Sequence, residues 1–202
     1  NYTSLQLSQE QTTQLLRESN RAYNTQVNDI LLTALGCTLP KITGSRINHI
    51  VLEGHGREEI DGSIDITRTL GWFTTMYPVV LEISEDFSSS IKNTKETLRQ
   101  IPNKGIGYGV LIGYSSNKLP RISFNYLGQF DKEDKLQSED KLQNLQTQSN
   151  STVQVQSFWN IVSEGSGISM HSANQDYNII NINGMVIDGE LKFSIATKLD
   201  EN

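Results

Sequence analysis

The spacing of apolar residues changes along this chain and predicts three helices. The run Ser8-Gln-Glu-Gln11 has the capping-box pattern, and apolar residues follow it at nearly helical spacing, which predicts a helix over about residues 9–21. A second helix is expected from about Thr25 to just before Pro40, because proline disrupts the interior of a helix. A third is expected over residues 87–100.

Short apolar or alternating runs predict strands between and after these helices. They cover residues 47–52, 73–83, 121–127, 153–162, 179–187 and 190–197. Pro78 lies within the second run and is expected on an edge strand, because proline cannot donate a ladder hydrogen bond. Asp188-Gly189 joins the last two runs and is typical of a two-residue hairpin turn.

Two polar stretches predict loops. Residues 53–71 contain four glycines and mixed charges. Residues 129–152 are rich in Gln, Ser, Asp and Lys and cannot bury enough apolar area to offset their ordering entropy, so a long mobile loop is expected there. Helices and strands interleave too irregularly for a doubly wound sheet. The pattern therefore predicts the α/β class, as a two-layer sandwich with a mixed β-sheet.

Composition excludes several classes of function. The formal net charge of −6 and the scattered basic residues argue against a nucleic-acid partner. No apolar run approaches the roughly 18 residues that span a membrane, and the N-terminus does not resemble a signal peptide. The single cysteine, Cys37, excludes an internal disulfide and is expected to be a buried structural thiol. These features fit a cytoplasmic location, and the missing initiator Met suggests an excised piece.

The run Val51-Leu-Glu-Gly-His-Gly-Arg-Glu58 carries the strongest candidate chemistry. Glu53 ends the predicted strand, where neighbours would partly desolvate its carboxylate, raise its pKa and make it a usable base. Gly54 and Gly56 flank His55 and permit backbone angles that other residues avoid. The alternative is an acid that merely pairs with Arg57 or Arg68.

Five motifs, in order, resemble those of the epimerization domains of non-ribosomal peptide synthetases. Glu53 to Glu58 matches Glu-Gly-His-Gly-Arg-Glu at all six positions. The other four are Tyr23 to Leu35, Arg68 to Pro78 with Leu70 in place of Val, Pro102 to Gly109, and Phe124 to Gly128. The resemblance implies the C-terminal lobe of such a domain over residues 1–202, with the chloramphenicol-acetyltransferase-like fold of the condensation superfamily.

The resemblance also implies a reaction and its partners. The domain would invert the α-carbon of an aminoacyl or peptidyl group, from L to D, while a peptidyl carrier protein holds the group as a thioester on its phosphopantetheine arm. The chain itself would bind no cofactor and no metal. The family also needs a His-His-x-x-x-Asp-Gly motif, whereas the only histidines here, His49, His55 and His171, are not adjacent. An N-terminal lobe is therefore expected upstream in a bacterial parent protein, and this lobe alone should be inactive.

Individual roles follow from the same resemblance. Glu53 and Tyr126 are the candidate catalytic residues, and Asn125, His55 and Trp72 are the candidate substrate-binding residues. Tyr126 could instead be a buried aromatic strand residue. Trp72, together with Phe73, is expected to pack beneath the cleft.

Other interpretations of particular residues remain open. A histidine between two glycines is more typical of a loop hydrogen-bonding residue, and Arg57 and Arg68 are expected to hold the loop through ion pairs. The segment Gly105-Ile-Gly-Tyr-Gly109 lacks the Lys-Ser/Thr of a phosphate-binding loop, so no nucleotide role is predicted.

Two alternative functions also remain. One is the C-terminal lobe of a condensation domain, which forms peptide bonds. The other is a non-catalytic carrier-docking module.

Overall fold

The computed structural model describes residues 1–113, 118–130, 167, 171, 173–174 and 176–199. Its strands form one six-stranded sheet in the order β1-β6-β5-β4-β2-β3. Their bounds are β1 (Tyr2–Gln6), β2 (Ile47–Gly54), β3 (Thr75–Glu82), β4 (Ile122–Gln129), β5 (Ile180–Ile187) and β6 (Glu190–Thr197). β4 pairs in parallel with β2 and β5, while the other neighbours are antiparallel, so the predicted mixed sheet is confirmed.

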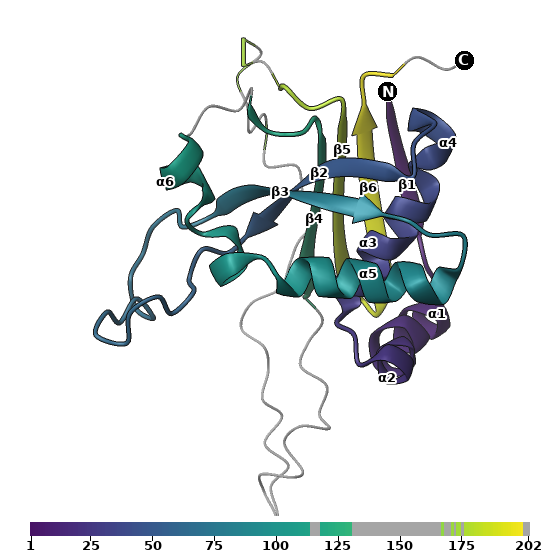
Figure 1. Ribbon diagram of the computed structural model, residues 1–202, viewed down its shortest axis with the longest axis horizontal. Coiled ribbons are helices and arrows are strands. Elements are labelled where there is room, and N and C mark those ends of the chain that lie inside the picture. The colour runs from purple at the N-terminus through teal and green to yellow at the C-terminus, as the bar shows by residue number, and fades with distance from the viewer. Residues whose placement is uncertain (114–117, 131–166, 168–170, 172, 175, 200–202) are drawn as a thin grey trace, which may run out of the picture.

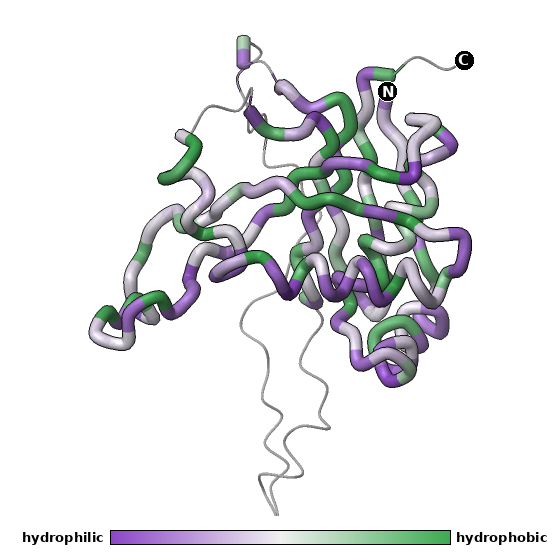
Figure 2. Tube along the Cα trace, in the orientation of Figure 1, coloured by the Kyte–Doolittle hydropathy of each residue, from purple (hydrophilic) through white to green (hydrophobic). Residues whose placement is uncertain are grey.

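The helices gather on one face of this sheet. They are α1 (Gln9–Thr13), α2 (Ser19–Tyr23), α3 (Val27–Thr38), α4 (Pro40–Thr43), α5 (Phe87–Arg99) and α6 (Tyr108–Ile112). Figure 1 shows α3 and α5 in front of the strands, and Figure 2 shows apolar positions along the strands and polar positions along α5. These two layers confirm the predicted α/β class.

The first predicted helix forms with one interruption. The capping box is confirmed, since Ser8 Oγ accepts a hydrogen bond from Gln11 N and Gln11 Oε1 accepts one from Ser8 N. A π-helical turn, Gln14–Glu18, separates α1 from α2, and Asn24 ends the segment with a left-handed backbone. The second predicted helix is confirmed as α3, which ends at Thr38, just before Pro40. Pro40 then opens the short helix α4 at its first turn, where its missing N–H is not needed.

The closing hairpin forms as predicted from the sequence, whereas some other strands differ from their predicted positions. Asp188 and Gly189 have φ values of 54° and 75°, as a two-residue hairpin turn requires. Pro78 lies on edge strand β3, also as predicted. Gln129 belongs to β4 rather than to the predicted loop, and β1 was not predicted. Residues 131–152 of the predicted loop and the predicted strand at 153–162 lie outside the described residues.

The core lies between the helices and one face of the sheet. Leu32 and Leu39 from the helical layer are buried against Ile50 and Leu52 of β2 and Phe124 of β4. Successive side chains of a strand point to opposite faces. Glu53 and Asn125, which follow Leu52 and Phe124, therefore belong to the face away from the helices.

Candidate functional site

Glu53 and Asn125 meet across two neighbouring strands. Leu52 of β2 lies beside Phe124 of β4 in a parallel register, which places the next residue of each strand side by side. Asn125 Nδ2 donates a hydrogen bond to Glu53 Oε2 over 3.1 Å. An amide donor thus orients a carboxylate at the end of β2, and the second carboxylate oxygen can act on a ligand.

The environment of Glu53 supports acid/base chemistry. The residue remains exposed, yet nearby protein atoms remove part of the water around its carboxylate, and this desolvation raises its pKa. A raised pKa brings a carboxylate closer to the range of a general base. The alternative pairing with Arg57 or Arg68 is absent from the described ion pairs.

A tight turn follows Glu53 and depends on one glycine. Gly56 has a φ of 66°, and a Cβ at this position would lie 1.6 Å from the carbonyl oxygen of Phe73. The glycine therefore permits two backbone segments to pack together. His55 accepts a hydrogen bond at Nδ1 from the N–H of Arg57 over 2.9 Å, so it has the loop hydrogen-bonding role that its position favours.

Glu58 links this turn to the glycine-rich segment at residues 102–109, a contact that the sequence analysis missed. Its Oε1 lies 3.0 Å from His55 Nε2, and its Oε2 lies 3.1 Å from Lys104 Nζ. Lys104 is 46 positions further along the chain, so no local spacing indicated the pair.

Arg57 holds the long β2–β3 loop by means other than the expected ion pair. Its guanidinium donates to the carbonyl oxygens of Ile66 and Thr69, each over 2.8 Å, and stacks 4.3 Å from the centre of the Phe73 ring. Two backbone carbonyl groups and an aromatic ring are thus the partners of the Arg57 guanidinium, in place of the expected carboxylate.

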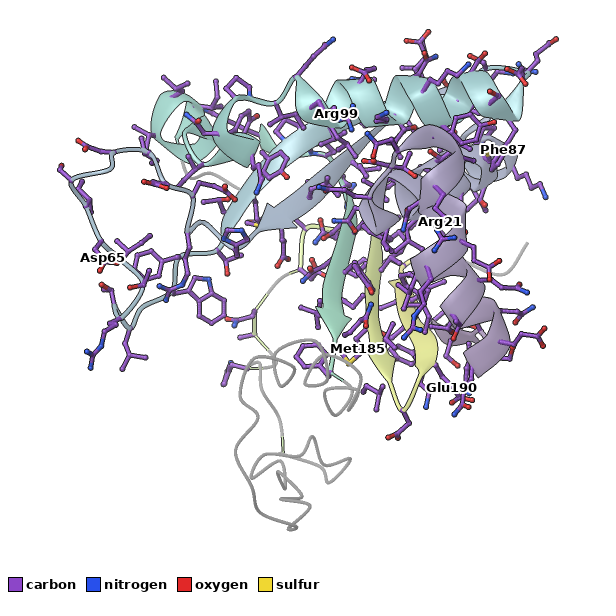
Figure 3. All side chains as sticks on the ribbon, turned by 90° about the horizontal axis from the view of Figure 1, so that it is seen from below. Arg21, Asp65, Phe87, Arg99, Met185 and Glu190 are labelled. Atoms are coloured by element: carbon purple, nitrogen blue, oxygen red, sulfur yellow. The ribbon has the colours of Figure 1, made fainter. Side chains whose placement is uncertain are left out.

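Trp72 does not pack beneath a cleft as predicted. It is 92% exposed on the loop that extends away from the sheet, whereas Phe73 is half-buried under Arg57. Figure 3 shows this loop, with Asp65 labelled, reaching outward from the body. Substrate contact by Trp72 and by His55 stays a prediction.

Tyr126 lies on the other face of β4 from Asn125. Its ring is half-buried and packs against the hydrophobic core, as the alternative interpretation of a strand aromatic expects. The structure therefore brings Asn125 to Glu53 but does not bring Tyr126 to the same face. A catalytic role for Tyr126 stays a prediction.

Two further features bear on the site's chemistry. No group of three His, Cys, Asp or Glu side chains suited to a metal occurs among the described residues. Cys37 is half-buried, and burial raises the pKa of its thiol, which disfavours the reactive thiolate.

Within the described part of the chain, no helix combines the length and apolarity needed to cross a membrane.

This chain belongs to the condensation domain family, whose sequence profile matches residues 1–184. It is 54% identical over 136 residues to bacitracin synthase 3 of Bacillus licheniformis, which covers 63% of this chain and 2% of that synthetase. It is 40% identical to gramicidin S synthase 1 of Brevibacillus brevis over 206 residues, covering 96% of this chain and 18% of that protein.

A solved structure with a similar fold is the epimerization domain from the third module of tyrocidine synthetase B. It superposes with a TM-score of 0.76 and 37% sequence identity, over 96% of this chain and 41% of that one. The chain thus spans less than half of the solved domain and a small fraction of each synthetase.

Proposed function

We propose that this chain is the C-terminal lobe of an epimerization domain, which inverts the α-carbon of an aminoacyl or peptidyl thioester carried by the phosphopantetheine arm of a carrier protein. The observation that carries the proposal is the carboxylate of Glu53, partly desolvated and oriented by Asn125 at the end of β2. The match of residues 53–58 to the epimerization motif and the 37% identity to a solved epimerization domain support it.

The proposed chemistry is a proton transfer with no net change in composition. A base takes the α-proton, the electron pair delocalises onto the thioester carbonyl, and an acid returns a proton to the opposite face of the α-carbon. Glu53 exchanges a proton on one side. In the same proposal, a histidine of the N-terminal lobe exchanges a proton on the other side. Hydrogen-bond donors stabilise the enolate that forms in between.

The proposal includes the setting of the domain. The peptidyl carrier protein and the N-terminal lobe are its partners, the phosphopantetheine arm comes with the carrier, and the location is the bacterial cytoplasm. Because Glu53 lies on the sheet face without described helices, an opposing lobe could approach it from that side.

Exchange of the α-proton for deuterium on a loaded carrier protein tests this function. The complete parent domain should exchange the proton and give a mixture of L and D products, while the 202-residue chain alone should not. Glu53→Gln in the complete domain should lower the exchange rate about 10²–10⁴-fold, because it removes an acid/base group. Glu59→Gln, in the same loop with an exposed side chain, is the matched control.

Three outcomes would contradict the proposal. Exchange by the isolated chain would show that no second lobe is needed. Peptide-bond formation without exchange by the complete domain would assign a condensation function, which the family match also accommodates. Carrier binding without either reaction would indicate a docking module.

A further inference from the structure

Two glycine-rich segments, residues 53–58 and 102–109, are joined through one carboxylate. Glu58 is the better buried partner, with a side chain 19% exposed, whereas His55 and Lys104 are 61% and 68% exposed. Each oxygen of Glu58 has its own partner, so the carboxylate bridges His55 in the turn after Glu53 and Lys104 in the second segment.

The hydrogen bonds allow one neutral form of the His55 ring. The backbone N–H of Arg57 donates to Nδ1, which must therefore carry the lone pair. The ring proton then lies on Nε2, where it is donated to Glu58. The position of Glu58 thus determines the orientation of His55, and through Arg57 N the path of the turn that begins at Gly54.

Lys104 is held in an unusual backbone conformation. Asn103, Lys104 and Gly105 have successive φ values of 43°, 47° and 78°, a left-handed region that residues other than glycine rarely occupy. A Cβ on Gly105 would lie 2.2 Å from the ring of Tyr77, so this aromatic side chain packs directly against the segment. Sparsely populated angles persist where surrounding contacts determine them, and they cluster at functional sites.

Tyr77 connects this segment back to β2. It lies opposite Leu52 in the β2–β3 pairing, one position before Glu53. Burial raises the pKa of the Tyr77 hydroxyl, and the nearby negative charge of Glu58 raises it further. The ring, the bridging carboxylate and the left-handed segment therefore form one contiguous group beside the end of β2.

We propose that Lys104 is a positioning residue, which acts through Glu58 and His55 to hold the turn after Glu53 in its catalytic geometry. The inference rests on the proposed function and assigns a role to the Pro102–Gly109 motif, which that function left unexplained. Exposed ion pairs add little to folding stability. Loss of the Lys104 charge should thus affect the reaction rather than the fold.

The test compares Lys104→Met, Lys104→Arg and Lys41→Met in the complete parent domain with its loaded carrier protein. Lys41 is an exposed lysine on α4, far along the chain from the site, and serves as the matched control. We expect Lys104→Met to lower kcat for α-proton exchange about tenfold or more without raising KM, since small misplacement of a reacting group is costly. Lys104→Arg should restore most of the rate because it keeps a cation opposite Glu58.

The nitrogen NMR signals of His55 provide a second readout, assigned with His55→Gln. The wild-type domain should show the form with the proton on Nε2, and Lys104→Met should move both ring shifts toward the average of the two neutral forms. The urea midpoint should match that of Lys41→Met.

The outcomes separate this inference from the proposed function. If the wild-type domain catalyses no exchange, the proposed function fails. If the wild type is active, a Lys104→Met rate equal to that of Lys41→Met overturns the inference. A lower rate with unchanged His55 signals, or with no recovery in Lys104→Arg, also overturns it.

Discussion

At the scale of single residues, Glu53 combines two properties that usually exclude one another. Its side chain remains accessible, as a group that meets a substrate must, yet neighbouring atoms desolvate its carboxylate enough to raise its pKa. The end of a strand provides both conditions, because the sheet shields one side of the carboxylate and leaves the other open. Asn125 then limits its rotation with a hydrogen bond.

The stability of the Glu53→Gln variant should increase relative to that of the wild type as the pH rises. The pKa of Glu53 is higher in the folded than in the unfolded chain, so its contribution to stability is fully present below the unfolded value and is lost as the pH rises through the folded value. The glutamine keeps an oxygen for Asn125 and does not ionise. From about pH 4 to pH 7, the free energy of unfolding of the variant should rise relative to that of the wild type. This relative gain should reach at most about 1 kcal/mol, because solvent around the exposed Glu53 side chain weakens the effect.

Urea unfolding of both proteins at constant ionic strength measures this difference. If the unfolding free energy of the variant instead falls relative to that of the wild type as the pH rises, the folded chain stabilises the charged form of Glu53. That result would leave Glu53 poorly suited to its proposed role as a base.

The sequence predicted the candidate residues better than their contacts. Glu53 and its turn follow from a strand that runs into glycines, together with the six-residue motif. The contact with Asn125 does not, because it requires β4 to lie next to β2 across 72 positions of the chain. The prediction that Trp72 packs beneath the cleft is wrong because an aromatic side chain after a turn packs inward only if the backbone directs it there, and this loop extends outward.

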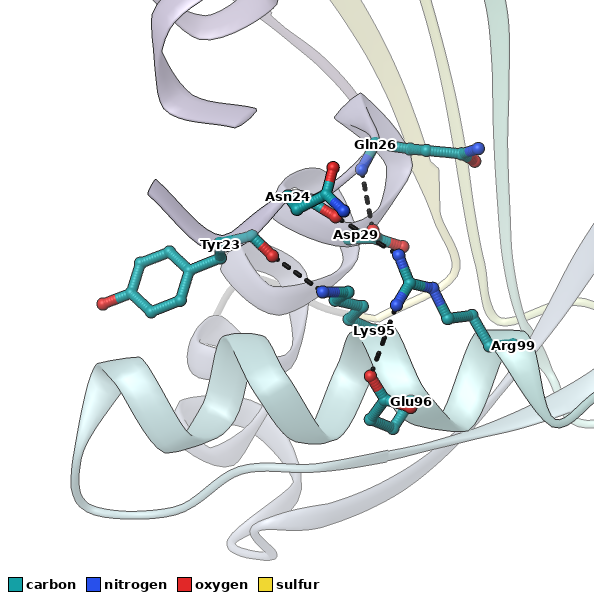
Figure 4. Close-up of polar contacts among 7 residues, drawn as sticks. All are labelled: Tyr23, Asn24, Gln26, Asp29, Lys95, Glu96 and Arg99. Atoms are coloured by element: carbon teal, nitrogen blue, oxygen red, sulfur yellow. Dashed lines mark hydrogen bonds and ion pairs between the residues drawn. The ribbon is translucent and has the colours of Figure 1, made fainter. Parts of the chain in front are cut away.

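At the scale of elements, α5 stabilises the end of α2 by donating to its last carbonyl groups. Lys95 donates to the carbonyl oxygen of Tyr23 over 2.7 Å, and Arg99 donates to that of Asn24 over 3.2 Å (Figure 4). The C-terminal carbonyl groups of a helix lack partners within the helix and carry partial negative charge. Two cations on a neighbouring helix satisfy both needs and bind α2 to α5.

Lys95→Met should therefore destabilise the chain by about 1–3 kcal/mol, because it leaves the carbonyl of Tyr23 without a charged donor. Lys92→Met, on an exposed position of the same helix, should change the free energy of unfolding by less than about 0.5 kcal/mol. Urea unfolding gives both values, and hydrogen exchange should show α2 opening first in the Lys95 variant. Equal effects of the two substitutions would mean that the cation adds nothing to this contact.

Two elements that the sequence did not predict have separate physical causes. All five residues of β1 are exposed, so no buried face produces an alternating pattern, and the strand is held by backbone hydrogen bonds to β6. The π-helical turn between α1 and α2 inserts one extra residue into the helical repeat, which explains why the apolar spacing there is only nearly helical. The closing hairpin has both signals, a buried face and a specific turn, and was predicted with its correct ends to within one residue.

At the scale of the whole molecule, the two ends of the described chain meet at one side of the sheet (Figure 1). The terminal amino group of Asn1 donates to the carbonyl oxygen of Thr197 over 2.8 Å, and Thr197 N donates to Asn1 O over 2.9 Å. β1 thus covers an edge of β6 that would otherwise expose unpaired backbone groups. At the opposite edge, Pro78 of β3 supplies a residue that cannot pair further.

The pairing of β1 with β6 predicts opposite responses to proline at adjacent positions. Asn1 N and Leu7 N both donate toward β6, and N–H groups alternate in direction along a strand, so the N–H of Thr3 points into the ladder and that of Ser4 points outward.

Thr3→Pro should remove a ladder bond, leave the carbonyl of Ile195 unpaired and cost about 2 kcal/mol or more. Ser4→Pro carries the same ring strain but removes no ladder bond, so its cost should be smaller by at least about 1 kcal/mol. Urea unfolding gives the two free energies, and amide exchange on β6 should increase only for Thr3→Pro. Equal losses would show that β1 contributes through its side chains, and that the two ends of the chain are not joined by this backbone ladder in solution.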